Sequence, residues 1–478
     1  MKLNELTIKQ AHDSLVKKEF TAVELTGSCL DEIKKTDQQI RAFITVTLEQ
    51  ALAKAKQVDQ KIAQGDSISD LAGIPYAAKD IFCVANIKTT AGSKILENFI
   101  APYESTTTAR LKKQDAVLVG KTNLDEFAMG SSTENSGFFP THNPHDLERV
   151  PGGSSGGSAA ALAAGHCLYA LGTDTGGSIR QPAAMCGVVG VKPTYGRTSR
   201  YGVIAMASSL DTIGYFAKNI EDAAIILQAV AGDDEKESTS SNIALDHYSE
   251  EIKKDVRGLK IGIPQEYFEL EGLDPEVKKI IAKAIKKIEE ITGSRAREIS
   301  LPHTDYALAC YYIIMPAEVS SNLARYDGIK YGLSEKSQDL LGSYLKSRAQ
   351  GFGAEVKRRI ILGTYSLSYG YYDAYYKKAL AVRTLVKKDF DQAFKLVDVI
   401  LAPTTPTPAF KLGEKIGDPL QMYAADIFTI PASLAGLPAL SLPCGQIGQL
   451  PVGLQIIGQQ FDEKTILRLG HHYEQSRK

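Results

Sequence analysis

The sequence lacks paired cysteines, and this absence excludes two kinds of protein. None of its six cysteines stands in a Cys-x-x-Cys pair, a spacing typical of zinc sites. Six cysteines in a chain of 478 residues also do not make the dense framework of a small disulfide-rich domain. They are Cys29, Cys83, Cys167, Cys186, Cys310 and Cys444. We therefore expect reduced thiols and no metal site built on cysteine.

Long apolar runs and a strong net charge are missing as well. No apolar stretch approaches the ~20 residues that span a bilayer, and residues 1–6 lack the hydrophobic region of a signal peptide. We therefore expect a cytoplasmic protein that does not bind membranes. The formal net charge of −1 gives no electrostatic footprint for nucleic acid. If nucleic acid enters the function, we expect a partner to hold it.

What the sequence does contain is the pattern of an α/β fold. From about residue 70, short apolar strands alternate with helices. This predicts a mixed central β-sheet covered by helices on both faces. The strands are expected at Ile74–Ala78, Ala116–Val119, Cys167–Leu171, Leu259–Ile263, Val397–Leu401, Ala439–Leu442 and Val452–Ile457.

We expect a single large domain over residues 1–478, with three distinct segments. Residues 1–65 are expected to be a helical N-terminal segment, and residues 70–230 carry the glycine-rich loops described below. Residues 306–390 are expected to be a helical insertion, because twelve of the 22 tyrosines fall between 306 and 376 within helical sequence. Such tyrosines either pack beneath the insertion or line a polar pocket. The polar residues 234–257 are expected to form a surface loop.

Three short segments carry the candidate chemistry: 74–80, 152–158 and 172–180. In the third, Ser178 follows Thr175-Gly176-Gly177 at the end of an apolar strand and precedes a helix. Glycines there allow a tight turn whose amide groups point inward, as an oxyanion hole requires. Ser178 is therefore the best candidate nucleophile. On this segment alone, a structural turn with an incidental serine explains the pattern as well.

The second segment, Gly152–Ser158, allows other interpretations. A glycine-rich loop before a helix favours anions, so a phosphate cradle is one alternative. The pattern Gly152-x-Ser154-x-Gly156 also matches a nucleophile elbow. The phosphate-loop template fails here, and its nearest other approach, at 120–122, has Asp115 where glycine is required. An elbow needs a histidine, and none of the eight histidines has an evident partner pattern.

Lys79 ends the apolar strand of the first segment. A lysine there is ordinarily a solvated strand end. If it is buried, however, desolvation lowers its pKa by several units. The neutral amine could then take a proton from a hydroxyl group.

Together, the runs at 152–158 and 172–180 resemble the signature of the amidase signature enzymes. The resemblance implies an amidase signature fold, with residues 70–230 as its catalytic core. It implies that Ser178 is the acylated nucleophile, that Ser154 is the bridging serine and has an unusual cis peptide, and that Lys79 is the ultimate base. The amides around Thr175, Gly176, Gly177 and Ser178 would form the oxyanion hole.

Within that family, the chain resembles the glutaminase component of tRNA-dependent amidotransferases. Residues 121–136 and 317–328 carry this likeness, which extends over essentially the whole length. It implies a glutaminase that supplies ammonia to a partner B subunit, where ATP and Mg²⁺ serve the amidation of Glu-tRNA(Gln), Asp-tRNA(Asn) or both. A small C subunit would brace the pair. The chain itself is expected to hold no cofactor or metal.

The resemblance also implies a pocket for free glutamine. Arg359 would bind the carboxylate and Asp426 the ammonium group, with Tyr311 in the wall; the neighbours Arg358 and Tyr312 are alternatives in register. Taken without the resemblance, each of these residues is an ordinary surface charge or packing residue. The remaining pocket residues expected are Met129, Gly130, Ser131 and Asp174.

Two other functions remain open from the sequence. A stand-alone amidase acting on small or fatty amides would use the same three catalytic residues with another pocket. A catalytically inactive scaffold would serve only complex assembly, although the presence of Lys79, Ser154 and Ser178 argues against it.

Overall fold

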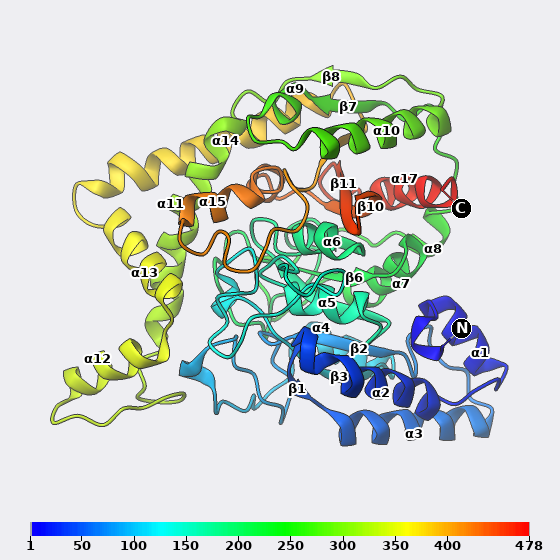
Figure 1. The fold of residues 1–478 in the computed structure, drawn as a ribbon, viewed down its shortest axis with the longest axis horizontal. Helices are drawn as coiled ribbons and strands as arrows, with labels where there is room; N and C mark the ends of the chain where they lie inside the picture. Colours follow the sequence, from blue (N-terminus) through cyan, green and yellow to red (C-terminus); the bar gives the residue numbers. More distant parts are fainter. Residues whose placement is uncertain (1, 478) are drawn as a thin grey trace.

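The computed structural model describes residues 2–477, which form one eleven-stranded sheet with helices packed around it (Figure 1). The strand order is β1-β3-β2-β4-β6-β5-β10-β11-β9-β7-β8. The strands are β1 (Phe43–Val46), β2 (Pro75–Lys79), β3 (Val117–Thr122), β4 (Tyr169–Asp174), β5 (Val189–Lys192), β6 (Thr212–Ala217), β7 (Ile261–Pro264), β8 (Arg297–Ile299), β9 (Val399–Pro403), β10 (Ala439–Ile447) and β11 (Leu450–Gly458).

The helices surround this sheet along the whole chain. They are α1 (Ile8–Val16), α2 (Ala22–Ile40), α3 (Leu48–Gln64), α4 (Thr106–Lys113), α5 (Gly156–Ala163), α6 (Arg180–Cys186), α7 (Ile220–Val230), α8 (Tyr248–Glu251), α9 (Gln265–Glu269), α10 (Pro275–Thr292), α11 (Thr304–Asn322), α12 (Leu340–Gly351), α13 (Ala354–Ser366), α14 (Lys377–Ala393), α15 (Pro419–Tyr423), α16 (Ile430–Leu434) and α17 (Glu463–Gln475). None of the helices within residues 2–477 combines the length and the apolar character needed to cross a bilayer.

The sheet is mixed, which confirms the predicted α/β class. Strand β2 runs parallel to β3 and β4, and β7 runs parallel to β8 and β9. The pairs at the centre, from β4 through β6, β5 and β10 to β11, are antiparallel. The sequence pattern located seven strands to within a few residues but missed β1, β5, β6 and β8. Residues 2–65 contain the helices α1, α2 and α3 and the strand β1, which pairs with β3 at the edge of the sheet.

Strand β10 shows that helices cover both faces of the sheet. A β-carbon on Gly453 would meet both Ser441 of β10 and Ala184 of α6, so Ser441 faces α6. Leu440 precedes Ser441 in β10, and its side chain would lie 3.7 Å from a β-carbon placed on Gly470 of α17. Because successive side chains of a strand point to opposite faces, α6 and α17 lie on opposite sides of the sheet.

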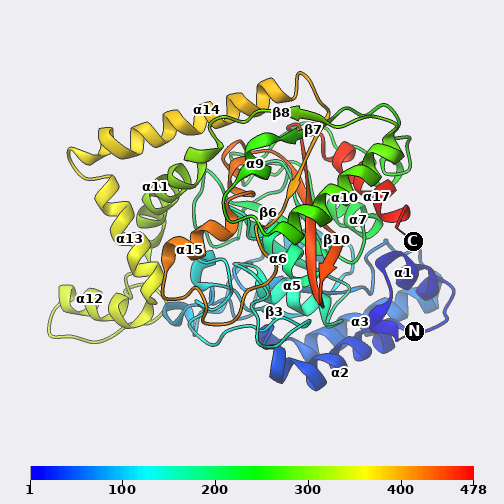
Figure 2. The same cartoon turned by 45° about the horizontal axis from the view of Figure 1, so that its top comes forward.

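Helices α11 to α14 form an arm at one edge of the molecule, with α12 at its far end (Figures 1 and 2). This arm corresponds to the tyrosine-rich segment 306–390. Segment 234–257, expected as a loop, contains the short helix α8, and Tyr248 in it is fully buried. The aromatic ring of Tyr248 thus ties this segment to the core.

A single glycine sets the spacing between two helices of the arm. A β-carbon on Gly363 of α13 would overlap the carbonyl group of Pro316 in α11. We expect Gly363→Ala to lower the free energy of unfolding by about 1–3 kcal/mol, because the helices would have to separate. Urea unfolding followed by circular dichroism measures this.

The control for this prediction is Gly27→Ala in α2. A β-carbon on Gly27 meets nothing within 4 Å, so alanine should raise the free energy of unfolding by about 0.5–1 kcal/mol through helix propensity. Equal behaviour of the two variants would contradict the close approach of α11 and α13.

Candidate active site

Lys79 lies at the end of β2 with its amine surrounded by hydroxyl groups. The side chain is completely buried. Its Nζ lies within hydrogen-bond distance of Ser154 Oγ at 2.7 Å, Ser155 Oγ at 2.9 Å and Thr173 Oγ1 at 3.0 Å. Burial lowers the pKa of Lys79 to about 7, against the opposing effect of Asp125 and two further carboxylates. An amine with this pKa is substantially neutral at physiological pH and can accept a proton.

The topology of the sheet explains why these groups meet. Strands β2 and β4 are parallel neighbours, with Ala78 opposite Leu171. Their carboxyl ends therefore lie at the same edge, which places Lys79 beside Thr173. The loop that carries Ser154 and Ser155 leads into α5, which packs against β2 and β4. The Gly153–Ser154 peptide bond in this loop is cis.

Ser178 lies in the turn between β4 and α6, next to the same loop. The Ser178 carbonyl oxygen accepts a hydrogen bond from the Ser155 N–H at 3.2 Å, and the Gly177 carbonyl accepts one from Gln181. The amides of Gly176, Gly177 and Ser178 have no hydrogen-bond partner within residues 2–477. Free N–H groups in a turn are what an oxyanion hole needs.

The turn is held by a buried ion pair between Asp174 and Arg180. Both side chains are fully buried, and the guanidinium binds the carboxylate through Nε at 3.0 Å and Nη2 at 2.9 Å. Burial by itself would raise the pKa of Asp174, but Arg180 outweighs this and holds the pKa below its ordinary value. Arg180 also donates to the Thr429 carbonyl and to Gln455.

Asp426 lies over the turn from the other side. A β-carbon on Gly177 would lie 2.7 Å from Asp426 Oδ1, so only glycine fits there. Ser131 donates to Oδ2, whereas Oδ1 is buried without a hydrogen-bond partner within residues 2–477. Burial raises the pKa of Asp426 to about 7. A buried carboxylate oxygen without a partner is suited to receive a cationic group of a ligand.

Tyr311 faces the neighbouring glycine. A β-carbon on Gly176 would lie 2.9 Å from Cζ of Tyr311 and 3.0 Å from its hydroxyl oxygen. The Tyr311 ring meets Tyr312 edge-on at 5.0 Å between centroids, and the guanidinium of Arg359 lies 5.4 Å from the Tyr312 ring. Arg359 is therefore connected to the turn through two aromatic rings.

Arg359 and Arg358 differ sharply in environment. Arg359 is 2% exposed, and its Nε donates to Glu355 Oε1 at 2.8 Å. Glu355 also accepts a hydrogen bond from the Tyr423 hydroxyl. Arg358 is paired with Glu355 from the solvent side, and its side chain is 45% exposed. The sequence left open whether Arg358 or Arg359 is the pocket residue. Only the side chain of Arg359 points into the molecule.

The segment Met129–Ser131 is positioned by Asp125. Its carboxylate accepts the backbone amides of Thr133 at 2.9 Å and Asn135 at 3.1 Å. A β-carbon on Gly130 would overlap the Asp125 carboxylate. Burial raises the pKa of Asp125 to about 6. Asp125 therefore fixes the loop that presents Ser131 to Asp426.

Comparisons with known proteins identify the family of the chain. The Amidase family model matches residues 24–467. The chain belongs to the amidase family. It is 57% identical to the A subunit of glutamyl-tRNA(Gln) amidotransferase from Desulforamulus reducens, over 100% of this chain and 98% of that protein. It is 58% identical to the protein of the same name from Microcystis aeruginosa, over 98% and 97%. The crystal structure of the corresponding protein from Thermotoga maritima is similar with a TM-score of 0.83 and 42% identity, over 99% and 95%.

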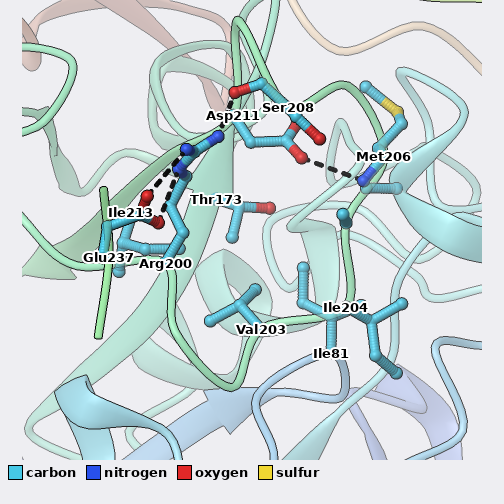
Figure 3. Close-up of a pocket in the computed structure, with 12 residues that line it drawn as sticks. Ile81, Thr173, Arg200, Val203, Ile204, Met206, Ser208, Asp211, Ile213 and Glu237 are labelled. Atoms are coloured by element: carbon cyan, nitrogen blue, oxygen red, sulfur yellow. Dashed lines mark hydrogen bonds and ion pairs between the residues drawn. The ribbon is translucent and has the colours of Figure 1, made fainter. Parts of the chain in front are cut away.

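Several polar residues of this amidase site escaped the sequence analysis. Ser155 and Thr173 bind Lys79 directly, and their place inside the glycine-rich segments was the available signal. Asp211 accepts a hydrogen bond from Thr175 Oγ1 at 2.7 Å and two from the backbone at 206–207. Figure 3 shows Asp211 and Thr173 beside a cavity of about 160 Å³. No local pattern in the sequence marks Asp211.

Amide hydrolysis that uses Lys79 as its base should increase with pH through about 7. Below its pKa of about 7 the amine is protonated and cannot accept a proton. We therefore expect kcat/KM at pH 6 to lie about tenfold below its plateau above pH 8. The pH dependence of ammonia release measures this.

Asp426 ionises in the same range and supplies the control. The variant Asp426→Asn should be slower but keep the same rising limb, because Lys79 is unchanged. If kcat/KM of Asp426→Asn no longer increased with pH, the pH dependence would be due to the Asp426 carboxyl group and not to Lys79.

Proposed function

We propose that this chain is the glutamine-hydrolysing component of a tRNA-dependent amidotransferase. The observation that carries the proposal is the buried Lys79 amine, 2.7 Å from Ser154 Oγ and beside the turn of Ser178. Relatives at 57–58% identity over nearly the whole chain are subunits of glutamyl-tRNA(Gln) amidotransferase. Because these relatives are named as subunits, the chain works as part of a larger complex.

In the proposed reaction, Ser178 Oγ attacks the side-chain carboxamide carbon of glutamine. The proton of the Ser178 hydroxyl passes to Ser154 Oγ, while the proton of the Ser154 hydroxyl passes to the neutral Lys79 amine. The amides at 176–178 stabilise the oxyanion of the tetrahedral intermediate. The carbon–nitrogen bond breaks as the proton returns to the nitrogen, and ammonia leaves. Water then cleaves the glutamyl ester by the same proton path and releases glutamate.

The pocket residues suit the two charged ends of free glutamine. Asp426, with its unpartnered oxygen, would accept the ammonium group, while Tyr311 borders the reacting centre. Arg359 would bind the carboxylate. Its present partner is Glu355, and Tyr423 shares that carboxylate. A glutamine carboxylate would therefore add a second anion to a guanidinium that still has N–H groups to donate.

The partners follow from the same proposal. Ammonia would pass to a B subunit that binds the mischarged tRNA and uses ATP and Mg²⁺, and a C subunit would complete a heterotrimer in the cytoplasm. We assign no cofactor or metal to this chain. Within residues 2–477, no group of three or more His, Cys, Asp or Glu side chains is arranged to hold a metal ion.

The deciding experiment measures ammonia release from glutamine by the chain with and without its B and C subunits. Ser178→Ala should lower the rate at least about 1000-fold, because the nucleophile is lost, while assembly persists. Full activity of the wild-type chain on simple amides without partners would favour a stand-alone amidase. Unchanged ammonia release in Ser178→Ala would remove the nucleophile assignment.

Two adjacent arginines test the substrate assignment. Arg359→Ala should raise the KM for glutamine about tenfold to hundredfold, because a hydrogen bond to a charged group contributes about 1.5–3 kcal/mol. Turnover of propionamide, which has no carboxylate, should change little. The control Arg358→Ala, on the exposed side of the same helix, should leave both substrates unaffected. The reverse pattern would transfer the carboxylate site to Arg358.

A further inference from the structure

The end of α13 and the start of α14 carry an unusually apolar surface. Nine of the 26 large hydrophobic side chains that are exposed within residues 2–477 lie in the twenty residues 361–380. We call these nine the outer tyrosine face. They are Ile361, Leu362, Tyr365, Leu367, Tyr369, Tyr371, Tyr372, Tyr375 and Leu380. Contiguous exposed apolar surface of this kind marks an interaction site.

Three of the five tyrosines of this face lie against one another. The rings of Tyr365 and Tyr371 lie 4.2 Å apart between centroids, and Tyr371 stacks on Tyr375 at 5.9 Å. Each of the three is nevertheless 39–48% exposed. The connection between α13 and α14 lies at the outer edge of the molecule in both views (Figures 1 and 2). The three rings contact one another and remain partly open to solvent.

The helices that carry the face contain more basic than acidic residues. Residues 340–388 contain ten Lys or Arg and only two Asp or Glu, although the whole chain has a net charge of −1. Lys357 and Arg358 are exposed on one side of the face, and Lys377 and Lys378 on the other. Such an arrangement attracts a partner whose own apolar patch has an acidic rim.

We propose that the outer tyrosine face is the docking surface for a protein partner with an apolar centre and an acidic rim. Resting on the proposed function, this partner is the subunit that receives the ammonia. A protein fits better than RNA, because aliphatic side chains such as Leu362 and Leu380 make up much of the face. Its tyrosine rings also pack against one another rather than standing apart to receive bases.

The position of the face connects docking with the pocket. Helix α13 buries Val356, Arg359, Gly363 and Ser366 toward α11 and exposes Ile361, Leu362 and Tyr365 on its other side. The helix that presents Arg359 to the pocket therefore also carries three of the nine side chains of the docking surface. A partner bound there would stabilise the position of the Arg359 guanidinium.

The test compares two triple variants of the full chain, each mixed with the purified B and C subunits from the same organism. The first is Tyr365→Ser/Tyr371→Ser/Tyr375→Ser. The second is the control Leu48→Ser/Ile243→Ser/Ile416→Ser, whose side chains are equally exposed elsewhere at 47–57%. We expect the tyrosine variant to bind at least tenfold more weakly and the control to bind like the wild type. Hydrogen exchange at 361–380 should slow when the wild-type complex forms.

The outcomes separate this inference from the proposed function. If the wild-type chain does not bind the two subunits, the proposed function fails and the inference fails with it. If the wild type binds and the tyrosine variant binds equally well, the face is wrong and the proposed function stands. Self-association of the chain alone, or binding of tRNA alone, that requires these tyrosines would also overturn the assignment to a protein partner.

Discussion

The candidate site depends on the amine of Lys79, which is fully buried and, within residues 2–477, has no carboxylate in hydrogen-bond contact. Within residues 2–477, the Lys79 amine has only hydroxyl groups as hydrogen-bond partners, while the carboxylate of the neighbouring Asp80 is bound to Lys121 at 2.7 Å. An isolated ammonium ion at this depth would cost several kcal/mol, so the amine loses its proton instead. Because the Asp80 carboxylate is paired with Lys121, it does not form an ion pair with Lys79, and the Lys79 amine can act as a base.

The turn that carries Ser178 depends in a similar way on distant parts of the chain. Arg180 binds Asp174 at the start of the turn, the carbonyl of Thr429 before α16, and Gln455 in β11. Removing any of these partners would leave a buried charge less well compensated. The turn is therefore positioned by residues up to 275 positions away along the chain, and the candidate site depends on contacts with the C-terminal part of the sheet.

The sequence was sufficient for what is local and insufficient for what is long-range. Glycine-rich loops at strand ends and apolar runs predicted the α/β class, the positions of β2 and β4, and the turn of Ser178. Short strands such as β5 and β8, with four and three residues, carry too little periodicity to be distinguished from loops. Contacts such as Ser131 with Asp426, or Thr175 with Asp211, join separate segments, so no spacing rule could have found them.

Helix α13 of the arm packs against α11 on one side and exposes large apolar side chains on the other. Burial toward α11 recurs at Val356, Arg359, Gly363 and Ser366, at spacings of three and four residues, which is the period of a helix packed on one side. Large apolar side chains on its other side gain nothing in the isolated chain, since burial contributes only about 25 cal/mol per Å² of surface that is actually removed from water. The docking proposed for the outer tyrosine face would account for these side chains. Because Arg359 and Glu355 are one turn apart on α13, a partner bound to the outer side of this helix would also restrain the ion pair on its inner side.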